Sequence, residues 1–168
     1  MTAVRHIIRA NRASQVITDT RALVKKSGGE KTLLDVSDMI RDVLVLVEPE
    51  VTRHRVTISE FLADGLPRVL GVWVELQQVM LNLVVNGIEA MADLSDRPRD
   101  LVIRSARDEA HGVSGIFVTV QDAGPGFSEE DRARAIVDAH GGRLWAISTL
   151  GRGATFQFVL PAAAPEAS

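Results

Sequence analysis

Hydrophobic positions recur along most of the chain with the spacing of helices or strands. The clearest helical pattern spans residues 76–91, where apolar residues return every three or four positions and define one face for burial. That face consists of Leu76, Val79, Met80, Leu83, Gly87, Ala90 and Met91. Further helices are predicted at residues 2–26, 38–47 and 128–140, and strands at 32–36, 56–62, 68–71 (a short strand or loop), 101–106, 116–122, 143–150 and 154–160.

The order of these elements predicts an α+β fold. Neighbouring strands can pair as hairpins, and the helices could all cover one face of the sheet, so we expect a two-layer α/β sandwich with an additional N-terminal helix. Ser37 is the expected N-cap of the second helix, and Pro49 is expected to end or kink it. We expect residues 1–30 to form the N-terminal helix, 31–161 one domain and 162–168 a disordered tail.

A polar stripe runs along the same helix as the clearest apolar face. Its members are spaced i, i+4, i+8 and i+11 and therefore project from one side: Gln78, Asn82, Asn86 and Glu89. Two asparagines inside an apolar segment are costly unless their amides are satisfied. Either they bond to neighbouring backbone, or their oxygens are ligands of a Mg²⁺ ion shared with phosphates.

Composition narrows the classes of function. The chain has 168 residues, 46% of them hydrophobic, a formal charge of −3 and no cysteine. It is long enough for one domain with a real core, and it cannot hold disulfides, thiolate zinc sites or cysteine nucleophiles. Scattered basic residues disfavour nucleic-acid binding, and no apolar run reaches the roughly 20 residues of a membrane span. We therefore expect a soluble, cytoplasmic chain.

A second candidate site follows a predicted strand directly, in the segment Asp122-Ala123-Gly124-Pro125-Gly126. Gly124 and Gly126 allow a sharp turn and a close approach of a ligand to the backbone. The carboxylate of Asp122 could accept a hydrogen bond from an exocyclic amine. The alternative is an ordinary turn at the exit of a hairpin. The third glycine of a dinucleotide fingerprint is missing.

Taken together and in order, four segments resemble the ATP-binding domain of bacterial sensor histidine kinases, within the ATPase superfamily that includes gyrase and the Hsp90 chaperones. They are Leu-x-Gln-Val-x-x-Asn-Leu-x-x-Asn-Gly-x-Glu-Ala (76–90), Asp-Ala-Gly-Pro-Gly (122–126), Ile-Val-Asp-Ala-His-Gly-Gly (136–142) and Gly-Arg-Gly-Ala-Thr-Phe-x-Phe-x-Leu-Pro (151–161). The resemblance covers residues 12–161 and implies a mixed sheet covered on one face by helices. Residues 12–26 are similar to the second helix of the family's dimerisation hairpin.

The resemblance implies a role for each matching residue of the polar stripe. Asn86 is the implied Mg²⁺ ligand, and Asn82 the partner on the phosphate side. Glu89, on the same face, is included in the implied ATP site. No catalytic residue is identified.

The downstream segments carry the implied adenine contacts. Asp122 would hold the adenine amino group, Gly124 and Gly126 would shape the pocket wall, and Thr155 would lie near adenine. His140, at a helix C-terminus, is expected to be structural.

The chain departs from the family's pattern in three places. First, no phosphoacceptor histidine is found, because His6, His54 and His111 all lack the expected context. Second, the ATP lid is missing, since residues 127–135 lead directly into the next helix. Because phosphoryl transfer depends on positioned electrostatics, this loss should lower turnover more than adenine recognition. Third, Gly71-Val72 stands where the family has Gly-Asp, so a helix cap is lost.

Two hypotheses of different classes follow. In the first, the chain is the ATP- and Mg²⁺-binding catalytic domain of a two-component histidine kinase, a protein-histidine kinase fragment whose γ-phosphate goes to a histidine on another polypeptide. Its partners would be a response regulator or a separate acceptor-histidine protein, and it could form a homodimer through the N-terminal helix. In the second, it is a catalytically silent scaffold of the same fold that docks a response regulator or a kinase. A histidine phosphotransferase with a decayed ATP domain is a third alternative.

Overall fold

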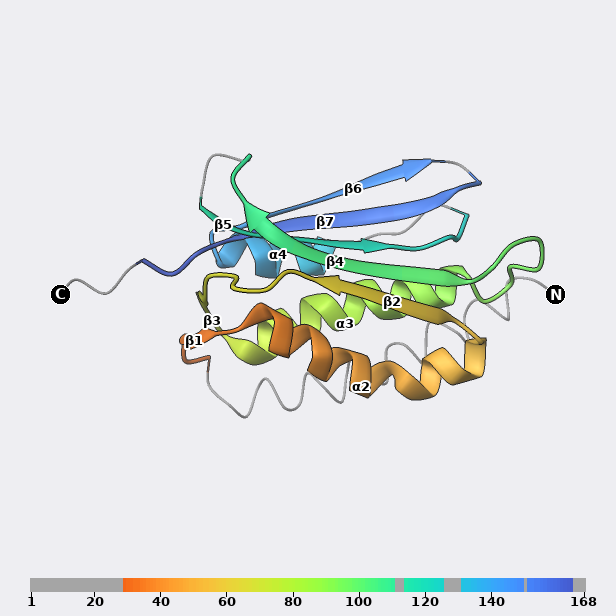
Figure 1. Cartoon of the computed structure of the whole chain (residues 1–168), viewed down its shortest axis with the longest axis horizontal. Helices are drawn as coiled ribbons and strands as arrows, with labels where there is room; N and C mark the ends of the chain where they lie inside the picture. The colour runs from red at the N-terminus through yellow and green to blue at the C-terminus, as the bar shows by residue number, and fades with distance from the viewer. Residues whose placement is uncertain (1–28, 111–113, 126–130, 150, 165–168) are drawn as a thin grey trace.

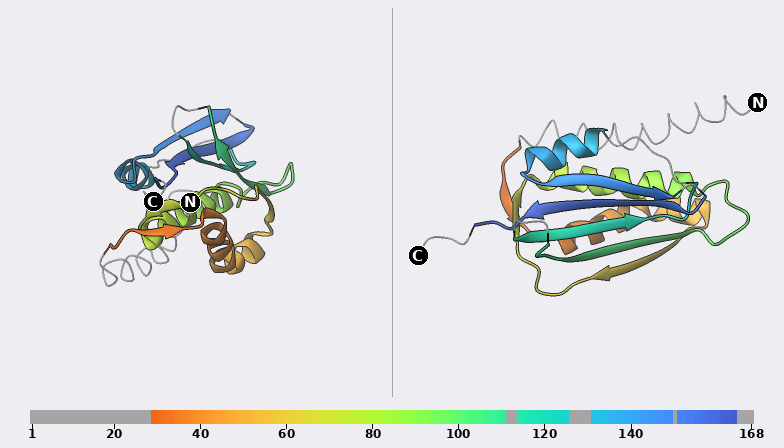
Figure 2. Two further views of the ribbon diagram at one scale, coloured as in Figure 1. Left: turned by 60° about the vertical axis from the view of Figure 1, so that its left-hand side comes forward. Right: turned by 90° about the horizontal axis from the view of Figure 1, so that it is seen from above.

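A computed structural model describes residues 29–110, 114–125, 131–149 and 151–164. Its larger sheet has five strands in the order β2-β4-β5-β7-β6, with β2 parallel to β4 and the other pairs antiparallel. Figure 1 shows the helices on one side of this sheet, and Figure 2 shows the two layers from further directions. The expected α+β sandwich with a mixed, singly covered sheet is therefore confirmed.

The elements follow the order expected from the pattern, with the strands β4–β5 and β6–β7 paired as hairpins. Their bounds are β1 Thr32–Leu34, α2 Val36–His54, β2 Thr57–Leu62, β3 Val69–Gly71, α3 Trp73–Ala90, β4 Asp100–Asp108, β5 Gly115–Gln121, α4 Asp131–Ala139, β6 Arg143–Thr149 and β7 Gly153–Pro161. The short strands β1 and β3 form a separate antiparallel pair.

Helix α2 differs from the expectation at both ends. Its N-cap is Asp35 and not Ser37, because the Asp35 side chain accepts hydrogen bonds from the backbone N–H groups of Ser37 and Asp38. The helix also continues through Pro49 to His54. Proline removes a hydrogen bond to the carbonyl four residues earlier, which is that of Val45. Val45 is 70% exposed, so solvent can satisfy the carbonyl and the helix is not forced to end.

Helix α3 is the centre of the core and is buried on more than one face. Beyond the expected apolar stripe, Leu81, Val84, Val85 and Ile88 are also buried, because α3 contacts α2, α4 and the strands β4 and β5. Trp73 packs half-buried against the core. A helix enclosed in this way holds its polar side chains in fixed positions, which is the requirement for a binding site.

The start of α3 lacks a side-chain cap, as expected from Gly71-Val72. Val72 is the N-cap residue and accepts no backbone N–H through its side chain. Instead, the Val72 N–H donates to His140 Nε2 at 3.1 Å. Because a backbone N–H can only donate, Nε2 carries no proton, and Nδ1–H donates to Ile136 O at 2.8 Å. His140 thus links α4 to the start of α3, in agreement with a structural role.

Val72→Thr should stabilise the protein. Threonine has nearly the shape of valine, and its hydroxyl can accept one of the N–H groups in the first turn of α3 that still lack a partner. We expect a gain of about 0.5–1 kcal/mol, or roughly 1–4 °C in melting temperature. Thermal unfolding of the wild type, Val72→Thr and the capless control Val72→Ala measures this. A Val72→Thr protein no more stable than the wild type would show that burial of the hydroxyl offsets the cap.

The sequence assigned the two ends of the chain separately from the central domain. The predicted N-terminal helix, its proposed role in dimerisation and residues 165–168 lie outside the described residues, so the division at residues 30 and 161 stays a prediction. At the start of the predicted tail, Ala162 and Ala163 donate backbone hydrogen bonds to Ser114 O and Arg68 O. Among the described helices, none is long and apolar enough to cross a membrane.

Candidate nucleotide site

The two candidate sites of the sequence lie together, between the C-terminal half of α3 and the turn after β5. The clearest link is Gly87, where a methyl group would lie 3.4 Å from Asp122 Cβ and 3.8 Å from Asp122 Oδ2. The polar stripe of α3 and the Asp122 turn are therefore neighbours in space, although 35 positions separate Gly87 from Asp122.

Asp122 is the central polar group of this region and is 5% exposed. Its Oδ1 accepts the N–H of Gly124 at 2.8 Å and that of Ala154 at 3.4 Å. No described residue donates to Oδ2, the oxygen that faces α3 near Gly87. Burial raises the pKa of this carboxyl above its ordinary value, and the two backbone hydrogen bonds oppose that rise. A hydrogen-bond donor on a bound ligand could therefore satisfy Oδ2 of this carboxylate.

Glycines bring the surrounding backbone close to Asp122. At Gly124 an added methyl group would lie 2.9 Å from Ala90 Cβ and 3.1 Å from Ala90 O, so the turn packs directly on the last residue of α3. At Gly153 a methyl group would collide with the carbonyl oxygen of Asp122, and the φ of 109° is one that only glycine adopts readily. The sharp turn expected from the glycines is present at Gly124, and Gly126 lies outside the described residues.

The polar stripe of α3 is only partly satisfied within the described part of the chain. Gln78 is 2% exposed with no partner for Nε2, and Asn82 Oδ1 is buried without a hydrogen bond. The interpretation that neighbouring backbone satisfies the asparagines therefore does not hold for this oxygen of Asn82. Asn86 and Glu89 are half-buried farther along α3, closer to Gly87 and Ala90 where the turn docks. Amide oxygens so placed fit the donor set of a hard cation shared with phosphates.

The implied position of Thr155 near adenine stays a prediction, and the structure adds the face of β7 that this residue occupies. Strand β7 alternates, with Ala154, Phe156, Phe158 and Leu160 buried on the helix side. Thr155 therefore points to the opposite face, opposite Gln121. Ala154 is the residue beside Asp122, bonded through both its N–H and its carbonyl.

Two residues that hold the Asp122 turn were not among the predicted site residues. Arg97, in the loop after α3, donates from Nε to Ala123 O at 2.8 Å and from Nη2 to Gly124 O at 3.2 Å. Met91 Sδ accepts the Ala123 N–H at 3.3 Å. The sequence marked Arg97 only as part of a polar loop, and nothing in its local pattern indicates a contact 26 positions away.

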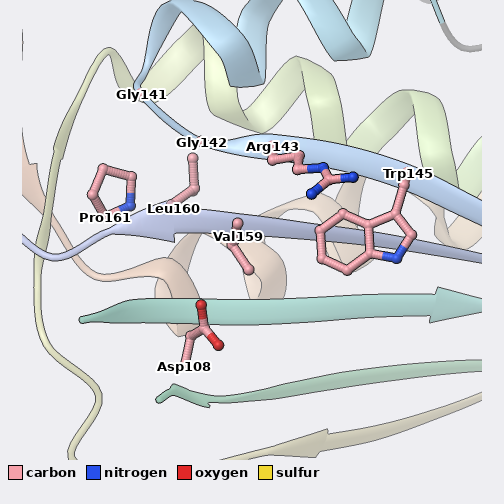
Figure 3. Close-up of a pocket in the computed structure, with 8 residues that line it drawn as sticks. All are labelled: Asp108, Gly141, Gly142, Arg143, Trp145, Val159, Leu160 and Pro161. Carbon is pink, nitrogen blue, oxygen red and sulfur yellow. The ribbon is translucent and has the colours of Figure 1, made fainter. Parts of the chain in front are cut away.

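A separate hollow of about 140 Å³ lies at the other end of β5, where Asp108 pairs with Gly115 and Gly115 with Pro161. Figure 3 shows the side chains that line it, including Asp108, Trp145 and Val159. The Arg143 guanidinium lies 5.5 Å from the centre of the Trp145 ring. Because Asp122 follows the opposite end of β5, this hollow is not part of the candidate nucleotide site.

Comparisons with known proteins agree on one family. No family model matches the chain. The sensor protein FixL of Bradyrhizobium diazoefficiens is 33% identical over 177 residues, covering 92% of this chain and 34% of FixL. The sensor protein TdiS of Thauera aromatica is 32% identical over 180 residues, covering 95% of this chain and 32% of TdiS.

Solved structures of histidine kinases share the fold of this chain. The catalytic domain of histidine kinase ThkA superposes with a TM-score of 0.65 at 26% identity, covering 79% of this chain and 95% of that one. ThkA in complex with the response regulator protein TrrA gives a TM-score of 0.69 at 24% identity, covering 92% of this chain and 49% of ThkA.

The chain is therefore homologous to the sensor histidine kinases. Within them it has the fold of the catalytic ATPase domain. It spans about a third of the length of FixL and TdiS.

Proposed function

We propose that the chain is the ATP- and Mg²⁺-binding catalytic domain of a two-component sensor histidine kinase, which donates the γ-phosphate to a histidine outside the chain. One observation carries the proposal. Asp122 is a buried carboxylate with one oxygen satisfied by two backbone N–H groups, and the other is turned toward α3 with no donor among the described residues. The exocyclic amine of adenine supplies the missing donor.

The remaining site residues fit the rest of the nucleotide. Gly87 and Gly124 let α3 and the turn pack closely around Asp122, since a methyl group at Gly87 would meet Leu101 and one at Gly124 would meet Ala90. Asn82 and Asn86, farther back along the same helix, would hold the phosphates and their Mg²⁺, and Glu89 lies on the same side of α3. When bound, the Mg²⁺ neutralises charge on the phosphate oxygens during transfer.

The rate of phosphoryl transfer is expected to be low even if the nucleotide binds well. Only residues 126–130 connect the Asp122 turn to α4, which leaves no length for a lid over the triphosphate. The matches to FixL and TdiS extend over 177 and 180 residues, more than the 168 of this chain, so both relatives carry residues that this chain lacks. The acceptor would be a separate histidine-bearing protein, and the next partner a response regulator.

The test is calorimetry and thermal unfolding with ADP or ATP and Mg²⁺. A ligand present at 100 times its dissociation constant adds about 2.7 kcal/mol, which corresponds to roughly 5–10 °C for a chain of this size. No shift at millimolar nucleotide would rule out the proposal and leave the scaffold hypothesis. Transfer of labelled phosphate to an added acceptor-histidine hairpin then separates a kinase from a protein that only binds.

Asn86→Ala should remove the dependence of nucleotide binding on Mg²⁺. The wild type is expected to bind ADP at least about tenfold more tightly with Mg²⁺ than with a chelator, since the metal bridges phosphates and protein. In Asn86→Ala the two affinities should become equal, because the amide oxygen that holds the metal is gone. Isothermal titration under both conditions measures this, with Asp93→Asn as a control beyond the end of α3. A variant with undiminished Mg²⁺ dependence would place the metal elsewhere.

A further inference from the structure

Arg97 makes contacts that its position in a surface loop does not require. The loop follows α3, and the Arg97 side chain is 30% exposed. One edge of its guanidinium, formed by Nε and Nη2, donates to two successive carbonyls, Ala123 O at 2.8 Å and Gly124 O at 3.2 Å. Only the planar fork of arginine can reach two such acceptors at once, since a lysine ammonium is a point donor.

Apart from the Gly124 N–H, which donates to the Asp122 carboxylate at 2.8 Å, the turn has few strong restraints besides Arg97. The Ala123 N–H donates to a thioether sulfur, Met91 Sδ, which is a weak acceptor. The Gly151 N–H reaches Pro125 O at 3.4 Å, a long distance for a hydrogen bond. Hydrogen bonds from a charged donor are about twice as strong as neutral ones. Among the described residues outside the turn, Arg97 therefore supplies the strongest hydrogen bonds to it.

One peptide group connects Arg97 to Asp122. The carbonyl of Ala123 and the N–H of Gly124 belong to the same planar trans unit, and they point in opposite directions. Arg97 holds the carbonyl end, and the N–H end donates to Asp122 Oδ1 at 2.8 Å. Fixing the plane of this peptide fixes the direction of the N–H. That direction sets the rotation of the carboxylate, and with it the direction in which Oδ2 faces.

We propose that Arg97 is a positioning residue for base recognition: by fixing the Ala123–Gly124 peptide it aims the free oxygen of Asp122 at the exocyclic amine of adenine. This inference rests on the proposed function. It adds that selectivity for an amino-bearing purine over one with a carbonyl at the same position depends on a side chain that never touches the base.

The experiment measures the affinities of the full chain for ADP and for inosine diphosphate, which has a carbonyl in place of the amine. The wild type should prefer ADP. In Arg97→Ala we expect ADP affinity to fall about tenfold, inosine diphosphate affinity to change less than about twofold, and the preference to shrink accordingly. Arg97→Lys should restore part of the preference, since it reaches one carbonyl. Asp96→Ala removes only the exposed partner of Arg97, at 3.4 Å, and should behave as the wild type.

A second readout needs no ligand and covers the case of a poorly folded alanine variant. In the wild type, the amide proton signal of Gly124 should move with pH as Asp122 ionises, because the N–H donates to that carboxylate. The movement should be lost in Arg97→Ala and reduced in Arg97→Gln and Arg97→Lys. If these variants only lower the melting temperature, and keep both the ADP preference and the Gly124 signal, Arg97 is merely structural and the inference is overturned.

The outcome also distinguishes this inference from the proposed function. A wild type that binds neither nucleotide refutes the proposed function and, with it, base recognition by Arg97. A wild type that prefers ADP, together with an Arg97→Ala variant of equal preference, leaves the proposed function standing and refutes only the role of Arg97.

Discussion

Asp122→Asn is expected to reduce stabilisation by ADP while making the ligand-free protein more stable. The asparagine Oδ1 can still accept the N–H groups of Gly124 and Ala154, so the turn is kept. Its Nδ2 replaces the free carboxylate oxygen and presents a donor to the adenine amine, which is also a donor. A lost hydrogen bond to a charged group weakens binding by about 10- to 100-fold. At a concentration that shifts the wild type by roughly 5–10 °C, the variant should shift by about 1–2 °C if the loss is 100-fold and by about 3–6 °C if it is tenfold.

The gain in stability follows from the burial of the charge. Because burial raises the pKa of Asp122 in the folded state above its unfolded value, the folded protein binds the proton more tightly than the unfolded chain does. The free energy of unfolding is therefore highest below the unfolded pKa, near 4, and falls as pH rises through the folded pKa. Asp122→Asn should remove this fall. Melting curves should be recorded from about pH 3 to about pH 8, a range that covers the titration of a carboxyl group. The difference in melting temperature between the variant and the wild type should grow with pH, in favour of the variant.

Asp108 offers a matched control for the effect on nucleotide binding. It is also a buried aspartate, 4% exposed, but it lies in the hollow at the other end of β5. Asp108→Asn should leave the response to ADP unchanged. If Asp122→Asn keeps the full nucleotide shift, Asp122 does not hold the base, and the proposed site is misplaced. If it melts below the wild type at neutral pH, the buried charge contributes stability that the ligand-free structure does not show.

Periodicity in the sequence was sufficient to locate the helices and strands, but it did not predict how deeply each of them is buried. The three- and four-residue spacing identified α3, and alternation identified the strands, because both reflect burial of one face. Helix α3 is buried on several sides because α2 and α4 pack against it. The local sequence pattern of α3 carries no information about these contacts. The continuation of α2 through Pro49 has a similar cause, since the exposure of Val45 removes the penalty that a local rule assigns.

The candidate site shows the same limit at the level of single residues. Asp122 and the asparagines were identified because a recognisable pattern surrounds them. For Thr155, the alternation of Ala154, Phe156 and Phe158 already contains the information that it faces away from the helices, and its implied contact with adenine stays a prediction. Arg97 could not have been found, because its partners lie on another element and carbonyl oxygens are present at every residue.

Gly153→Ala should destabilise the protein far more than Gly151→Ala, although both glycines belong to the same turn. Both have positive φ, 75° at Gly151 and 109° at Gly153. At Gly151 nothing lies within 4 Å of an added methyl group, so only backbone strain of about 1–2 kcal/mol is expected. At Gly153 the methyl group would collide with Asp122 O and lie 3.2 Å from Ala123 Cα. Since backbone atoms cannot move aside cheaply, we expect a cost of at least about 3 kcal/mol.

Comparing the two variants tests whether the β5–β7 contact holds the candidate site together. Where Gly153 passes Asp122, the Asp122 N–H donates to Ala154 O at 2.9 Å, and the Ala154 N–H reaches Asp122 Oδ1 at 3.4 Å. Displacing β7 by a methyl group must lengthen both. Gly153→Ala should therefore melt roughly 6–12 °C below the wild type and bind ADP more weakly in the fraction that remains folded, whereas Gly151→Ala should bind normally. Equal losses of stability in the two variants would mean that strain at positive φ, and not the close approach of β7 to Asp122, is what requires glycine at position 153.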